Sequence, residues 1–64
     1  MEAFRELLEL SQRDKKGLTF YVGGQTIVGY VVRIVDNGGS VEVRNQTQSR
    51  VVIRLDRVDA VGLT

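Results

Sequence analysis

The sequence predicts a small all-β domain with one N-terminal helix, in which five strongly bent strands form a barrel. Helical spacing of apolar residues is confined to the first 16 residues. From residue 17 onward, β-branched and aromatic residues alternate with polar ones in short runs. Glycine pairs and polar turns separate these runs, and no repeat or linker divides the chain. We therefore expect a single domain over residues 1–64, with the helix within 1–16 and a barrel of local hairpins within 17–64.

The helix is predicted by an amphipathic pattern that runs from residue 2 to about residue 13. Glutamates near its start and the basic residues Arg13, Lys15 and Lys16 near its end suit the helix dipole. Gly17 is well placed to end the helix in a left-handed conformation. The apolar face of this helix holds Phe4, Leu7, Leu8 and Ser11.

Alternation and length predict five short strands, at residues 18–22, 25–35, 41–44, 50–55 and 58–61. The second run is apolar on both faces and too long to lie flat with one side in water, so it must bend or change layers. Gly29 lies near its middle, where a missing side chain permits tight coiling. Residues 36–40 have the composition of a turn, and residues 45–49 form a polar connection.

Composition narrows the possible functions. The chain has 64 residues without cysteine or histidine, so neither disulfides nor the usual zinc ligand sets can stabilise its small core, and we expect oligomerisation instead.

The formal net charge of +1 is too small for binding to nucleic acid through bulk charge, so any nucleic-acid site must be local. No apolar run is long enough to span a bilayer, and the first residues do not resemble a signal peptide, so we expect a cytoplasmic protein.

The residue types also argue against an enzyme. Without histidine or cysteine, a nucleophile would need a lysine or a carboxylate as its base, and no paired carboxylates share an evident pocket. The glycine pairs at 23–24 and 38–39 are not phosphate cradles, because neither stands between a strand and a helix. We therefore expect a non-enzyme without a cofactor or a metal.

Two segments resemble the signatures of the Sm and Sm-like family. Residues 51–61, Val-Val-Ile-Arg-Leu-Asp-Arg-Val-Asp-Ala-Val, resemble the second signature, which reads Ile-Arg-Gly, a polar pair and two apolar residues three apart. Leu55 stands in place of the glycine. Residues 18–43 resemble the first signature through Gly29, Val31 and Asp36. Together with the N-terminal helix, the resemblance covers essentially the whole chain and includes the bacterial Hfq branch.

Three departures from the family pattern fall in and before the turn at residues 36–40. Gly29 and Asp36 are seven residues apart where the family has six, which implies a bulge or a shifted loop. Ser40 stands where the family prefers asparagine, and Asn37 lies beside the aspartate instead. Glycine, at position 38 or 39, replaces the apolar or aromatic residue that stacks on a base in many relatives.

The resemblance implies a homo-oligomeric ring of about five to seven subunits, in which the fourth strand of one copy pairs with the fifth strand of the next. It also implies that loop residues and the signature arginine line the pore and bind single-stranded, uridine-rich RNA. Such a protein would act as an RNA chaperone or regulator. The residues at the matching positions are Asp36, Asn37, Ser40 and Arg54.

Each of these residues also has a structural interpretation. Arg54 can hold a base by hydrogen bonds and stacking, or it can pair with Asp36 or Asp56 in a loop network. Asp36 and Asn37 can read a pyrimidine edge, or they can serve the turn before the two glycines. The competing functions are a structural or protein-interaction ring with this fold but no nucleotide pocket, and a monomeric SH3-like adaptor barrel.

Overall fold

The computed structural model describes residues 2–64, which form one helix followed by five antiparallel strands. Two short turns, η1 (Asp36–Gly38) and η2 (Leu55–Arg57), join β2 to β3 and β4 to β5. The all-β class with an N-terminal helix is confirmed. The elements are α1 (Glu2–Asp14), β1 (Leu18–Val22), β2 (Gln25–Val35), β3 (Ser40–Arg44), β4 (Val51–Arg54) and β5 (Val58–Leu63).

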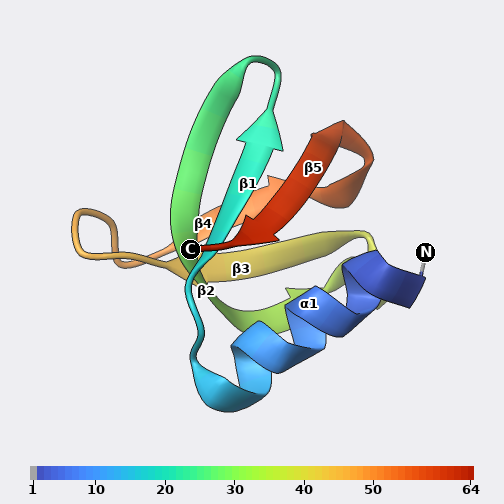
Figure 1. Ribbon diagram of the computed structural model, residues 1–64, viewed down its shortest axis with the longest axis horizontal. Helices are drawn as coiled ribbons and strands as arrows, with labels where there is room; N and C mark the ends of the chain where they lie inside the picture. Colours follow the sequence, from blue (N-terminus) through green and yellow to red (C-terminus); the bar gives the residue numbers. More distant parts are fainter. Residues whose placement is uncertain (1) are drawn as a thin grey trace.

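The strands form a single bent sheet in the order β4-β3-β2-β1-β5. Hairpins join β1 to β2, β2 to β3 and β3 to β4, as expected. The expectation of local hairpins throughout was wrong at the end of the chain, because β5 pairs with β1 and lies beside it in Figure 1. Within the described residues, β4 and β5 therefore form the two edges of the sheet, each with one neighbour.

Strand β2 bends the sheet by changing its partner along its length. Residues 25–29 pair with β1, and residues 30–35 pair with β3. The change occurs at Gly29, where a Cβ atom would lie 2.5 Å from the carbonyl oxygen of Arg44. No side chain fits this close approach of two backbones, so the structural role predicted for Gly29 is confirmed.

A β-bulge follows directly on this change of partner. Val31 lies opposite Val43, whereas Arg33 lies opposite the adjacent residue Glu42, so that Val32 is the extra residue of β2. The spacing of seven residues between Gly29 and Asp36, one more than in the Sm pattern, predicted a bulge or a shifted loop. The bulge is observed.

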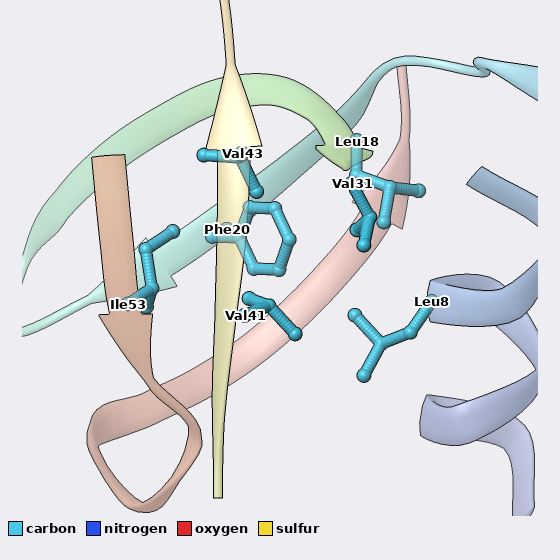
Figure 2. Close-up of a cluster of buried hydrophobic side chains, with 7 residues drawn as sticks. All are labelled: Leu8, Leu18, Phe20, Val31, Val41, Val43 and Ile53. Carbon is cyan, nitrogen blue, oxygen red and sulfur yellow. The ribbon is translucent and has the colours of Figure 1, made fainter. Parts of the chain in front are cut away.

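The hydrophobic core lies between the bent sheet and α1. Phe20 of β1 stands at its centre, surrounded by side chains from α1 and from β2, β3 and β4 (Figure 2). Strand β5 contributes Val58 and Val61, which are partly buried against this cluster. The buried members are Leu8, Leu18, Phe20, Val31, Val41, Val43 and Ile53.

Helix α1 packs against β2 and also approaches β5. Its predicted apolar face is confirmed, because Leu8 and Ser11 are buried while Phe4 and Leu7 are partly buried. The predicted role of Gly17 was wrong: the helix ends at Asp14, and Lys15 takes the left-handed conformation with φ 55°.

Gly17 instead contacts the C-terminal residue, Thr64. The Gly17 carbonyl accepts a hydrogen bond from the backbone N–H of Thr64 at 3.1 Å, and a Cβ atom at Gly17 would lie 2.6 Å from the Thr64 hydroxyl. Gly17 therefore lies against the Thr64 side chain rather than in a left-handed turn.

The remaining strand limits differ from expectation at the ends of the hairpins. Strand β5 extends to Leu63 rather than to residue 61, because its pairing with β1 continues to Leu18. Strand β4 is shorter than expected, because residue 55 already begins η2. Within residues 2–64, the single α-helix is too short and too polar to cross a membrane.

Candidate functional site

The turn between β2 and β3 is built from residues that tolerate a left-handed backbone. Asp36 and Asn37 both have φ 55°, and Gly38 has φ 90°. Aspartate, asparagine and glycine are the residue types that adopt this conformation most readily. The Gly39 amide then donates to the Asp36 carbonyl at 3.0 Å. The prediction that Asp36 and Asn37 lie in a turn is thus confirmed.

The link between β4 and β5 lies directly beside this turn. The Leu55 amide donates to the Gly39 carbonyl at 2.9 Å, which extends the β3–β4 pairing by one step beyond the strand ends. Arg54 lies opposite Ser40 in the same register. The two segments that carry the predicted site residues therefore meet through backbone hydrogen bonds.

Three of the four predicted site residues line one open hollow with a volume of about 600 Å³: Asp36, Ser40 and Arg54. The fourth, Asn37, lines an adjoining hollow instead. The two hollows share Gly38 and Leu55. The fold thus brings together three of the predicted residues, from η1, the start of β3 and the end of β4, while Asn37 lines a separate hollow.

The guanidinium of Arg54 pairs with the carboxylate of Asp56, and both residues line the hollow. Arg54 Nη2 lies 2.9 Å from Asp56 Oδ2, and both side chains are 63% exposed. Among the described residues, no ion pair joins Arg54 to Asp36. An exposed pair of this kind contributes about 0–1 kcal/mol, so Arg54 can exchange this partner for a ligand at little cost.

The charges that line the hollow favour a neutral polar ligand over a phosphate group. Two carboxylates, those of Asp36 and Asp56, lie beside the single guanidinium of Arg54. Ser40 is 5% exposed and adds a hydroxyl at the start of β3. A carboxylate accepts hydrogen bonds and a guanidinium donates them, whereas two carboxylates repel a phosphate. The arrangement therefore suits a neutral ligand with alternating donors and acceptors.

Comparisons of the chain with protein-family models, with curated proteins and with solved structures found no match. Among the described residues, no group of His, Cys, Asp or Glu side chains is arranged to hold a metal ion.

A second, larger groove lies at the other end of the sheet and contains none of the predicted site residues. It is lined by Lys15 and Tyr30 and by the β3–β4 connection. Asn45 orders this connection, because its side-chain oxygen accepts hydrogen bonds from the backbone amides of Thr47 and Gln48. The groove is open and its two charged lining residues, Lys15 and Arg44, are both basic, so it offers no comparable set of opposed charges.

The basic cluster at the end of α1 is partly neutralised within the helix. Arg13 Nε lies 3.2 Å from Asp14 Oδ1, and this hydrogen bond holds the pKa of the Asp14 carboxyl below its ordinary value. Both groups are exposed. Arg13 therefore already has an anionic partner at the opposite end of the helix from the hollow.

Sequence reasoning missed the aromatic side chain of the hollow, that of Phe4 of α1. The helical periodicity placed Phe4 on the apolar face but carried no signal for which part of the sheet that face would meet. Only the packing of α1 brings this aromatic ring beside Asp36 and Arg54.

Proposed function

We propose that this chain is an Sm-like, ring-forming protein that binds single-stranded, uridine-rich RNA at the hollow between η1 and η2. One observation supports this function most directly. The side chains of Asp36, Ser40 and Arg54, which the family resemblance assigns to RNA contact, come from η1, the first residue of β3 and the last residue of β4, and they line one hollow. The strand order also supports it, because it leaves β4 and β5 at opposite edges of the sheet.

The ring would form through these edges. A strand with one neighbour presents unpaired N–H and C=O groups along its free side, and in a homo-oligomer such edges pair with each other. Val52 on β4 is 51% exposed and Leu63 on β5 is 55% exposed. Pairing β4 of one subunit with β5 of the next would cover both edges and produce a closed ring of about five to seven subunits.

The hollow has the groups that a uracil edge requires. That edge presents carbonyl oxygens on either side of one N–H group, so it needs a donor and an acceptor placed together. Arg54 supplies donors, Asp36 supplies an acceptor, and the Ser40 hydroxyl can serve as either. Because the site would repeat in every subunit, weak binding at each hollow would add up over a strand that follows the ring.

The competing function is a structural or protein-interaction ring without a nucleotide pocket. The excess of carboxylates in the hollow favours it, as does the absence of an aromatic residue from η1. Light scattering combined with titration of fluorescent oligouridine at low and moderate salt separates the two functions. We expect a ring that binds oligouridine more tightly than oligoadenosine. A ring without binding would support the competitor, and a monomer would exclude both.

A further inference from the structure

The hollow between η1 and η2 has an aromatic wall that comes from the helix. Phe4 lines this hollow together with Asp36 and Arg54, and it also lines the adjoining hollow together with Asn37. Its ring is partly buried and packs against the core on one side, which leaves part of it facing the two hollows. No other aromatic residue lines either hollow within the described chain.

The next residue of the helix places a positive charge over the turn. A Cβ atom built on Gly38 would lie 3.9 Å from Nη2 of Arg5, so the Arg5 guanidinium lies above the turn. Arg5 lines the adjoining hollow and its side chain is exposed. It adds a second guanidinium next to a hollow that otherwise holds two carboxylates and Arg54.

The turn itself leaves room for a flat ligand but has no aromatic side chain on which the ligand could stack. Gly38, with φ 90°, and Gly39 line the hollow without side chains. Hydrogen bonds from Asp36 and Arg54 could hold the edge of a base, but the apolar faces of a base are normally covered by an aromatic ring. A binding site for bases built on this turn therefore needs a ring from another element.

We infer that Phe4 is the base-stacking residue of this protein and that Arg5 contacts the adjoining phosphate. This inference rests on the proposed RNA function and assigns the stacking role to α1 rather than to the β2–β3 turn. The base would lie against the ring of Phe4 with its edge toward Arg54 and Asp36. Arg5 would meet the backbone on the side of the second hollow, where no carboxylate lines the wall.

A tryptophan substitution tests the stacking directly. The chain contains no tryptophan, so Phe4→Trp introduces a single fluorophore into the wall of the hollow. We expect oligouridine to quench its emission, with the same midpoint as binding measured by the anisotropy of the labelled RNA. The matched control is Tyr21→Trp, since Tyr21 lies on β1, is 46% exposed and lines neither hollow. Its emission should not change.

Affinity measurements separate stacking from packing. Phe4→Leu keeps an apolar side chain but removes the ring, and it should weaken oligouridine binding about tenfold for each hollow that the oligonucleotide occupies, as expected for the loss of one base–aromatic stack in each subunit. Phe4→Tyr keeps the ring and should bind like the wild type. Arg5→Ala should reduce the slope of log affinity against log salt by about 1 for each occupied subunit, whereas Arg13→Ala should not, because Arg13 is bound to Asp14.

The inference and the function on which it rests fail in different ways. If wild-type protein binds oligouridine, but Phe4→Leu binds equally well and the Phe4→Trp emission does not change, the stacking role is wrong and the proposed function stands. If wild-type protein does not bind oligouridine at low salt, both are wrong. A thermal melt checks the fold of Phe4→Leu; if that variant is unfolded, the Phe4→Tyr affinity and the Phe4→Trp emission decide.

Discussion

The buried hydroxyl of Ser11 on α1 accepts a hydrogen bond from the backbone amide of Val31 on β2, at 2.8 Å. The same hydroxyl donates to the carbonyl of Lys16 at 2.6 Å. One side chain thus joins the helix, the segment that follows it and the central strand directly before its bulge. Because α1 carries Phe4, this contact also helps to set the position of the aromatic wall of the candidate site.

Ser11→Ala should therefore destabilise the fold more than the loss of one hydroxyl suggests. The substitution leaves the Val31 amide and the Lys16 carbonyl without this partner at a position where Ser11 is 0% exposed. We expect the free energy of unfolding to fall by about 2 kcal/mol, the usual cost of unpaired buried polar groups. Urea denaturation measures it, and Ser49→Ala, at an exposed position, is the control. Equal midpoints for the two variants would contradict the role of Ser11.

Gly29→Ala tests the bend in β2. The new methyl group would lie 2.5 Å from the Arg44 carbonyl oxygen, so the backbone of β2 or β3 must shift. We expect a loss of about 2 kcal/mol of stability, as for other forced overpacking, and a lower Tm by calorimetry. The matched control is Gly62→Ala on β5, where no atom lies within 4 Å of the new methyl group. If both variants melt alike, the close approach at Gly29 can be relieved without cost.

The fold could be predicted from the sequence wherever the signals are local. The bounds of β1 and β2 are as expected, because alternation and the glycine turn at residues 23–24 specify them within a few residues. The pairing of β5 with β1 could not be predicted, because it joins the two ends of the strand region and depends on the bend at Gly29. The alternation of apolar and polar residues also gave no indication that the side chain of Glu42 would be buried.

Glu42 shows why burial of a charge cannot be predicted from alternation alone. It is 3% exposed, and its Oε1 atom lies 3.4 Å from Nε of Arg33 and 3.3 Å from Nε of Arg50. The two arginines come from β2 and from the β3–β4 connection, so only the sheet register brings them over the carboxylate. The same limit applies to the candidate site, where the resemblance indicated the loop residues but not Phe4.

Val52→Pro tests the ring. The Leu55 amide faces β3, and amides alternate in direction along an antiparallel strand, so the Ile53 amide also faces β3 while that of Val52 faces the open edge. Proline is tolerated at such a position in an edge strand but cannot donate to a neighbouring subunit. We therefore expect a folded monomer, with a circular dichroism spectrum close to that of the wild type and the scattering mass of a single chain.

The control for this variant is Val52→Thr, which keeps a β-branched side chain and the backbone N–H group. It should assemble like the wild-type protein. An oligomer of unchanged mass in Val52→Pro would mean that β4 does not join the subunits, and the edge pairing on which the ring depends would have to be abandoned.

Arg54→Ala should weaken the binding of oligouridine while leaving the assembly and its melting behaviour almost unchanged. The side chain is 63% exposed and its one ion pair, with Asp56, is a surface pair, so its removal should change the free energy of unfolding by less than about 1 kcal/mol. In the ring, by contrast, Arg54 would contact one base in every subunit. A loss of about 1 kcal/mol for each bound base would accumulate along the strand, so affinity should fall more steeply for longer oligouridines than for short ones.

Asp56→Asn is the complementary variant for this arginine. It removes the carboxylate that holds the Arg54 guanidinium at 2.9 Å and so frees the guanidinium for a ligand. Oligouridine binding should therefore become tighter, whereas Arg54→Ala and the double variant should bind equally weakly, because the carboxylate acts through the arginine. Anisotropy titrations at two salt concentrations measure all three variants. If Arg54→Ala binds as tightly as the wild type at both concentrations, the RNA would have to lie elsewhere on the ring, and the convergence of Asp36, Ser40 and Arg54 would be structural.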